Sequence, residues 1–97
     1  MDRLYVIVRS DLPTGLQMAQ ACHAALTYCE DHPERPENMI VLHAPSEHDL
    51  AQMAALLNST GANVSTFREP DLDGQLTAIA ACGTSAKRAL AALPLAA

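Results

Sequence analysis

The run Leu-Tyr-Val-Ile-Val at residues 4–8 places the tightest constraint on how this chain can fold. It is apolar at every position and rich in β-branched residues, which is typical of a strand covered on both faces. Other elements must therefore lie on each side of the sheet that contains it. We expect a three-layer α/β fold with residues 4–8 in the middle of the sheet.

A helix is predicted directly after this strand. Pro13 and Gly15 interrupt the chain within residues 10–15, and helical periodicity begins at about Thr14 and continues to Cys29. The residues expected to form the apolar face of this helix are Met18, Cys22, Ala25, Leu26 and Cys29. A polar loop with two prolines then covers residues 31–38, and residues 39–42 predict a second short strand.

The second helix has the clearest signals in the sequence. Ser46 and Asp49 have the spacing of an N-terminal capping box. Leu50, Met53, Ala54 and Leu57 follow at helical spacing and predict a core-facing stripe. Gly61 stands where a helix commonly ends in a left-handed residue.

The last third of the chain predicts two strands and a helix. Residues 63–68 alternate in polarity, residues 69–74 are rich in turn formers, and residues 76–82 are an apolar strand. A final helix is expected over residues 84–93, ending at Pro94. Helices join the first three strands, which favours parallel neighbours, whereas the short 69–74 connection favours an antiparallel last strand. This predicts a four-stranded mixed sheet flanked by helices, with a ferredoxin-like arrangement as the second choice.

Length and composition narrow the class of protein. The chain has 97 residues, which suits one domain over residues 1–97. Because a domain of this size has a small core, a homodimer contact would add to its stability. Aromatic residues make up only 3%, so the core must rely on aliphatic residues and on alanines, which let elements approach closely. The formal net charge of −5 argues against a module that holds nucleic acid by charge alone. The three cysteines are odd in number and form no C-x-x-C motif, and together with the lack of a signal or membrane segment this predicts a reducing, cytoplasmic location.

A ligand site is expected at the carboxyl ends of the parallel strands, where open α/β sheets bind their ligands. Three loops should meet there, carrying Arg9, Ser10 and Asp11, then His43, then Arg68 and Glu69. The two arginines are candidates for contacts with phosphate. The alternative is a pair of ordinary surface ion pairs, Arg9 with Asp11 and Arg68 with Glu69.

The first helix carries a second group of candidates. Leu16, Gln20, His23 and Thr27 form one stripe beside the expected apolar face, so Gln20 and His23 lie one turn apart and are predicted to touch the same ligand. The alternative is a structural flank with a hydrogen-bonded histidine. Leu16 is unexpected at the start of this stripe, where a polar residue would normally stand.

These residues resemble a known signature. V-R-S-D-L at residues 8–12, Gly15, and A-Q-A-C-H-A-A-L at residues 19–26 are similar to the type II peptidyl-tRNA hydrolases, in which R-x-D-L ends a strand and a helix carries A-Q-x-x-H-A-A. H-A-P-S-E-H-D-L at residues 43–50 also resembles that family's strand, turn and helix start. The resemblance implies a mixed four-stranded sheet between helices. It also implies hydrolysis of the ester that joins a peptide to the 3′ end of tRNA.

The resemblance implies catalytic roles for Gln20 and His23, which match directly, and for Asp11, which matches the acid at the strand end. Two features depart from the family pattern. Leu16 replaces a lysine that follows the motif glycine, and residues 69–74 (EPDLDG) replace a D-x-G-x-T loop, as in divergent members that carry Glu and Pro there. Arg9, Arg68 and Ser10 are the residues expected to contact the phosphate of the substrate.

Two functional hypotheses remain. In the first, the chain is an ester hydrolase acting on peptidyl-tRNA or a related aminoacyl ester. In the second, it is a catalytically impaired binding module that recognises tRNA ends, a small ligand or a protein partner. No cofactor is expected, and the histidines and cysteines lack the spacing of metal ligands. Cysteine catalysis by Cys22 and His23 is not expected, because adjacent helical residues point about 100° apart. Cys22 belongs to the expected apolar face and is predicted to be a small core residue.

Overall fold

A computed structural model of the chain describes residues 3–34, 36–91 and 93. The elements follow the predicted order: β1 (Arg3–Arg9), α1 (Thr14–Asp31), β2 (Asn38–Ala44), α2 (Glu47–Ser59), β3 (Asn63–Glu69), the 3-10 turn η1 (Pro70–Leu72), β4 (Gln75–Cys82) and α3 (Thr84–Ala89). The last helix is shorter than the predicted range of residues 84–93, since α3 ends at Ala89. Ala92 and Pro94 lie outside the described residues. None of the described helices combines the length and apolarity needed to cross a membrane.

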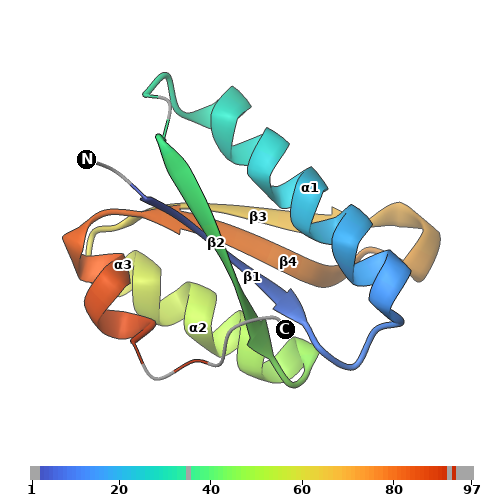
Figure 1. Cartoon of the computed structure of the whole chain (residues 1–97). Helices are drawn as coiled ribbons and strands as arrows, with labels where there is room; N and C mark the ends of the chain where they lie inside the picture. Colours follow the sequence, from blue (N-terminus) through green and yellow to red (C-terminus); the bar gives the residue numbers. More distant parts are fainter. Residues whose placement is uncertain (1–2, 35, 92, 94–97) are drawn as a thin grey trace.

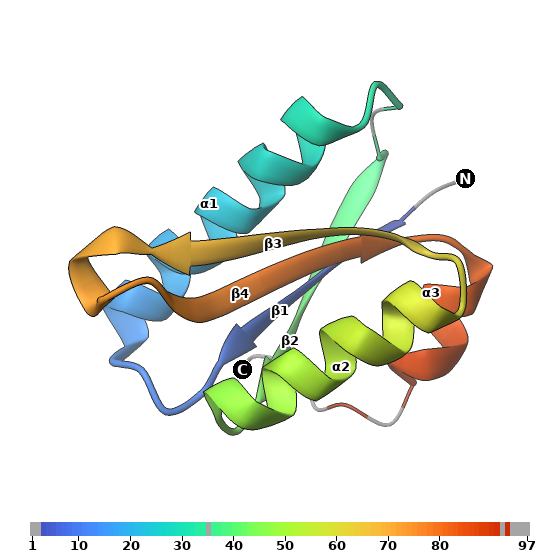
Figure 2. The same cartoon turned by 180° about the vertical axis from the view of Figure 1, so that it is seen from behind.

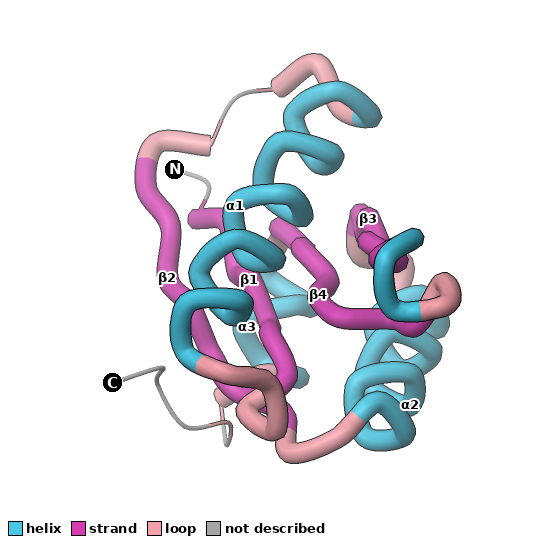
Figure 3. Tube along the Cα trace, turned by 90° about the vertical axis from the view of Figure 1, so that its right-hand side faces the viewer, coloured by secondary structure: helices cyan, strands magenta, loops and turns pink. Residues whose placement is uncertain are grey.

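The four strands form one mixed sheet in the order β2-β1-β4-β3. β1 pairs with β2 in parallel, whereas β4 is antiparallel to both β1 and β3. Figure 3 shows this sheet with β2 at one edge and β3 at the other. The antiparallel last strand is confirmed, as is the parallel pairing of β1 with β2. The expectation of parallel neighbours is wrong for β3, which runs in the direction of β1 but is separated from it by β4. The ferredoxin-like alternative is wrong.

Helices cover the two faces of the sheet unequally. Figures 1 and 2 show α1 alone on one face and α2 with α3 on the other. The central strand β1 separates two cores, since Tyr5 and Ile7 pack on the α2 side while Val6 and Val8 pack on the α1 side. The predicted strand with cover on both faces is confirmed.

The predicted apolar face of α1 is wrong. Met18 is 67% exposed, Leu26 is 62% exposed, and Cys22 is exposed rather than a core residue. The buried residues of this helix are Gln20, Ala21, Ala24 and Tyr28. The physical reason is close approach: Ala24 packs with Ala78 and Ala80 of the sheet, where longer side chains would not fit.

The second helix follows its sequence signals. The Ser46 hydroxyl accepts a hydrogen bond from the Asp49 backbone N–H at 3.2 Å and donates to the Asp49 carboxylate at 2.9 Å. Leu50 and Leu57 are fully buried. Gly61 has a φ of +82°, as a residue just beyond a helix end often does.

An irregularity in the β3–β4 pairing shapes the rim of the sheet. Phe67 pairs with Ala78 and the next residue, Arg68, pairs with Leu76, so Thr77 is an extra residue on β4. The Thr77 hydroxyl bonds to Gln20 of α1, and Ala78 belongs to the core between α1 and the sheet. The side chains of these two successive residues therefore lie on the same face of the sheet. A bulge of this kind redirects a side chain, and here it turns the Thr77 hydroxyl toward α1.

The true buried face of α1 can be tested by substitution. Ala24→Leu is expected to lower the free energy of unfolding by about 1–3 kcal/mol, because the added volume has no space between α1 and the sheet. Leu26→Ala, the control on the exposed face of the same helix, is expected to change it by less than about 0.5 kcal/mol. Urea unfolding measures both. A larger loss for Leu26→Ala than for Ala24→Leu would contradict this orientation of the helix.

Candidate functional site

The carboxyl ends of the parallel strands meet at one rim, as predicted. The Ser10 backbone N–H donates to the Ala44 carbonyl at 2.9 Å, which joins the ends of β1 and β2. The Arg9 side chain reaches Gln75 at the start of β4, and Gln75 pairs with Glu69 at the end of β3. Elements far apart in the sequence thus come together around this rim.

Arg9 and Asp11 form a two-pronged ion pair at this rim. Arg9 Nε and Nη2 each donate to one carboxylate oxygen of Asp11 at 2.9 Å. Arg9 Nη1 also donates to Gln75 Oε1 at 2.9 Å and to the Leu76 carbonyl at 3.3 Å. Hydrogen bonding from Arg9 lowers the pKa of Asp11, and the same pair raises the pKa of Arg9. The alternative of an ion pair between Arg9 and Asp11 is therefore the arrangement in the structure.

The Arg9 guanidinium lies on the α2 side of the sheet. It follows Tyr5 and Ile7 at the alternating positions that face α2, and the charge of Glu47, the first residue of α2, contributes to its raised pKa. The Gln20 side chain lies on the opposite face, between α1 and the sheet, where it bonds to Thr77. The structure therefore does not bring Arg9 and Gln20 to a common surface.

Gln20 links three elements through a chain of hydrogen bonds. The Thr77 hydroxyl donates to Gln20 Oε1 at 2.6 Å, and Gln20 Nε2 donates to Glu69 Oε1 at 2.8 Å. Gln20 is only 1% exposed. Its amide is therefore fixed in orientation and enclosed, so it holds Glu69 in place and is not itself open to a ligand.

Glu69 is the acidic group that this chain of hydrogen bonds presents at the rim. Its second carboxylate oxygen accepts a hydrogen bond from the Asp71 backbone N–H at 3.2 Å. The hydrogen bond from Gln20 lowers the pKa of Glu69 most, followed by the Asp71 N–H and the charge of His23. Glu69 is half-buried, so its carboxylate has a defined position and keeps an open side.

His23 is exposed one turn beyond Gln20 on the same helix. Its ring stacks on Phe67 of β3, with centroids 4.8 Å apart and planes 23° from parallel. Within residues 3–34, 36–91 and 93, no hydrogen bond engages its ring nitrogens. The histidine is thus held by stacking rather than by a hydrogen bond, and its nitrogens are open to a ligand beside Glu69.

The other predicted residues have varied surroundings. Arg68 is exposed and donates to the Gly74 carbonyl at 3.3 Å rather than pairing with Glu69. Ser10 is exposed, and its hydroxyl lies 3.4 Å from the Ala44 carbonyl. Leu16 is half-buried one helical turn before Gln20. Whether these residues and Asp11 act on a substrate stays a prediction.

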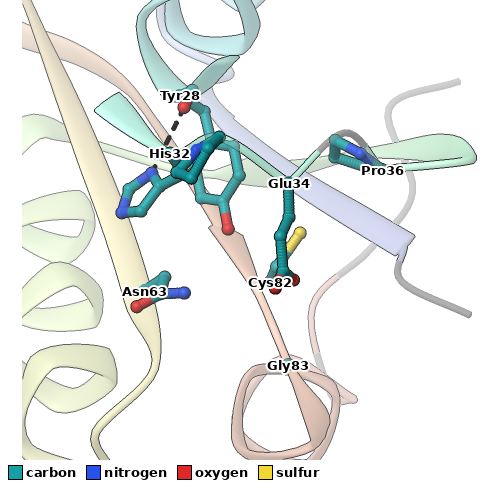
Figure 4. Close-up of a pocket in the computed structure, with 8 residues that line it drawn as sticks. Tyr28, His32, Glu34, Pro36, Asn63, Cys82 and Gly83 are labelled. Atoms are coloured by element: carbon teal, nitrogen blue, oxygen red, sulfur yellow. Dashed lines mark hydrogen bonds between the residues drawn. The ribbon is translucent and has the colours of Figure 1, made fainter. Parts of the chain in front are cut away.

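Two hollows lie away from Glu69. One, of about 470 Å³, runs between α1 and β2, where His43 Nε2 and Gln17 Oε1 are 2.7 Å apart. The other, of about 210 Å³, lies by the C-terminal end of α1, where His32 stacks on Tyr28 and hydrogen bonds to its carbonyl (Figure 4). Neither hollow is lined by His23, Gln20 or Glu69. In the described part of the chain, no group of three or more His, Cys, Asp or Glu side chains is arranged to hold a metal ion.

Sequence reasoning missed the roles of Phe67 and Thr77. It placed Glu69 in a loop of the expected ligand site but gave it no role beyond an ion pair with Arg68. Thr77 carries a usable signal, because it is a polar residue within an otherwise apolar predicted strand. The bulge that turns Thr77 toward Gln20 has no evident signal in residues 76–82. The Phe67–His23 stacking depends on the packing of α1 against β3.

Comparison with known proteins identifies the family of this chain. The family model described as peptidyl-tRNA hydrolase PTH2 matches residues 3–89, which include α1, β3 and β4. The chain belongs to the PTH2 family. Among curated proteins, none matches the chain.

A solved structure shares the fold of this PTH2 family member. It is a protein of unknown function from Agrobacterium tumefaciens strain C58, with a TM-score of 0.80 and 10% sequence identity. The similarity covers 99% of this chain and 98% of that one. At this identity the match concerns the fold alone, and it supports the three-layer arrangement around the mixed sheet.

The Arg9–Asp11 pair predicts a pH-dependent contribution to stability. Because the pKa of Asp11 is lowered on folding, the pair stabilises the fold above the unfolded value of about 3.9, and this contribution is lost as the pH falls through the folded value. Asp11→Asn is therefore expected to lower the urea midpoint at pH 7, with a deficit that shrinks at a pH well below the ordinary aspartate value of about 3.9. Glu30→Gln, an exposed control on α1, should show no such convergence. A deficit for Asp11→Asn that is equal at both pH values would contradict this role.

Proposed function

We propose that this PTH2 family member hydrolyses the ester that joins a peptide or amino acid to the 3′ end of tRNA. The observation that carries the proposal is the open imidazole of His23, which stacks on Phe67 one turn from Gln20 on the helix that bears the family motif, while the Gln20 amide fixes the Glu69 carboxylate on the same side of the sheet. A carboxylate and an imidazole of this kind suit general acid–base chemistry on an ester. The family match supports the substrate class.

In the proposed reaction His23 acts as general base. A water molecule gives a proton to the imidazole as its oxygen attacks the ester carbonyl carbon. The bond from that carbon to the tRNA 3′ oxygen then breaks, and the leaving oxygen takes up the proton. The Glu69 carboxylate, held by Gln20 and the Asp71 backbone N–H, lies on the same side of the sheet as the imidazolium that forms between these two steps.

The roles of the remaining residues follow from their contacts. Gln20 and Thr77 position Glu69 through their hydrogen bonds and do not act on the substrate themselves. Arg68 is the better candidate for a phosphate contact, because the Arg9 guanidinium is already engaged by Asp11 and Gln75. Asp11 fixes Arg9 on the α2 side of the sheet and has no direct role in this scheme, and Ser10 is exposed to solvent at the same rim.

Leu16 favours a second candidate function. Ester hydrolysis benefits from a donor to the developing oxyanion, and loss of one such donor typically costs about 10²–10³ in rate. An apolar residue at position 16 is compatible with a module of the same fold that binds tRNA ends, a small ligand or a protein partner without turnover. A cytoplasmic location and a possible homodimer are expected with either function.

The enzyme proposal is tested by deacylation of peptidyl-tRNA. His23→Ala is expected to lower the rate by about 10²–10⁴-fold, the usual contribution of a general base. His48→Ala, which removes an exposed histidine from α2 on the other face of the sheet, is the matched control and should leave the rate unchanged.

Two results would count against the enzyme. Equal rates for wild type and His23→Ala would remove the assigned base. No turnover by wild type, together with tRNA binding that weakens steeply as salt is raised, would favour the binding module.

A further inference from the structure

We propose that the outer edge of β2 is the surface through which two copies of this chain associate, by antiparallel pairing of β2 with the β2 of the second copy. The inference names a surface and its partner, and it does not depend on the hydrolase activity proposed above. It follows from an open strand edge, an apolar hollow beside that edge and the distribution of charge.

The backbone of β2 is open along its outer edge. β2 is an outermost strand of the sheet, and among the described residues no strand pairs with its far side (Figure 3). The Ala44 carbonyl accepts a hydrogen bond from the Ser10 N–H, so the backbone groups of Ala44 point toward β1. Because this direction alternates along a strand, Met39, Val41 and His43 point their N–H and C=O groups outward. Such a row of groups pairs with another extended strand.

The side chains of the same three residues line an apolar hollow. Met39, Val41 and His43 form one wall of the hollow of about 470 Å³ between β2 and α1, and Met18 and Cys22 of α1 lie on its other wall. Met18 is 67% exposed and Met39 is 51% exposed. Large apolar side chains gathered in this way mark a surface that a partner covers. A partner that fits must supply both a strand for β2 and apolar side chains for the hollow.

The distribution of charge favours a second copy as that partner. Residues 38–44 of β2 and residues 14–29 of α1 contain no Asp, Glu, Lys or Arg, although the chain has a formal net charge of −5. Two copies repel each other over most of their surface, so an uncharged region is where they can meet. A charged peptide finds no counter-charge here, whereas a second copy brings the same uncharged strand and the same hollow.

A two-fold axis at Val41 uses the whole open edge. Antiparallel pairing about this axis sets Val41 opposite its equivalent and Met39 opposite the partner's His43, and each of these pairs exchanges two backbone hydrogen bonds. Directly opposite side chains lie on the same face of the sheet. The partner's Met39 therefore lies at the end of the hollow where His43 contacts Gln17.

This pairing leaves the assembly without an open apolar edge. Its outermost strands are then the two copies of β3, which carry the exposed residues Thr66 and Arg68 and pair irregularly with β4. Charged side chains and irregularities are features by which edge strands avoid further pairing. Residues 38–44 of β2 contain no charged residue and no proline. The association therefore closes at two copies.

The first test measures association of the wild-type chain and the exchange of its amides. Sedimentation velocity over a concentration series is expected to show a monomer–dimer equilibrium. By NMR, the amides of Met39, Val41 and His43 should be protected from hydrogen exchange in the dimer and should exchange faster on dilution. Those of Ile40 and Leu42 should stay protected throughout, because they face β1.

Three results of this test would overturn the inference. The first is a monomer at every concentration up to the millimolar range. The second is a dimer in which the three outward amides stay unprotected, since another surface would then form the contact. The third is protection of these amides in a monomer only after an apolar peptide is added, which would assign the edge to a peptide.

The second test is a charge swap between residues 39 and 43. Met39→Lys and His43→Glu are each expected to raise the dissociation constant of the dimer by about tenfold, because each change occurs twice across the two-fold axis. The double variant should regain most of the affinity, since each new ammonium group faces a new carboxylate of the partner. Within one chain these positions are about 13 Å apart along the strand, too far to pair with each other.

Thr66→Lys, on the opposite edge of the sheet, is the control and should leave the dissociation constant unchanged. A double variant that associates no more tightly than either single variant would refute the antiparallel register. Loss of the dimer in Thr66→Lys, with Met39→Lys unaffected, would place the contact on β3 and refute the proposed interface.

Discussion

The hydrogen-bond chain from Thr77 through Gln20 to Glu69 is the interaction on which the rest of this site depends. It joins β4, α1 and the end of β3 inside the protein, with Gln20 1% exposed. A buried primary amide is costly unless its groups are paired, so the partners on both sides are required for this packing. Because the hydroxyl donates to the amide oxygen and the amide nitrogen donates to the carboxylate, the direction of the hydrogen bonds is set, and the bond from Gln20 lowers the pKa of Glu69.

Two features of the fold make this chain of hydrogen bonds possible. Alanines on α1 and on the sheet let the helix approach closely, and the bulge at Thr77 turns a hydroxyl to the same side as Ala78. The stacking of His23 on Phe67 adds a second tie between α1 and β3. On the opposite face of the sheet, hydrogen bonds from Arg9 to Asp11 and Gln75 stabilise the rim. The sheet thus divides one rim into a structural side and a side suited to chemistry.

Much of the fold follows from local sequence signals. The apolar strand at residues 4–8, the Ser46 cap and the short 69–74 connection were enough to predict element order, strand direction and the two covered faces. The buried face of α1 could not be predicted in the same way, because hydrophobicity favoured Met18 and Leu26 whereas close packing demanded Ala24 and admitted a paired Gln20. The same limit applied to the site: Gln20 and His23 were found by motif, but their partners Thr77 and Phe67 depend on a bulge and on helix placement.

The central claim is that Gln20 holds the Glu69 carboxylate in position and lowers its pKa. It is tested most directly by following the side-chain carboxyl of Glu69 by carbon NMR across a pH titration, in wild type and in the near-isosteric variant Gln20→Met. The account predicts that Glu69 titrates below the ordinary range of a glutamate in wild type and that its pKa rises toward that range in Gln20→Met. Identical titration curves for the two proteins would contradict it.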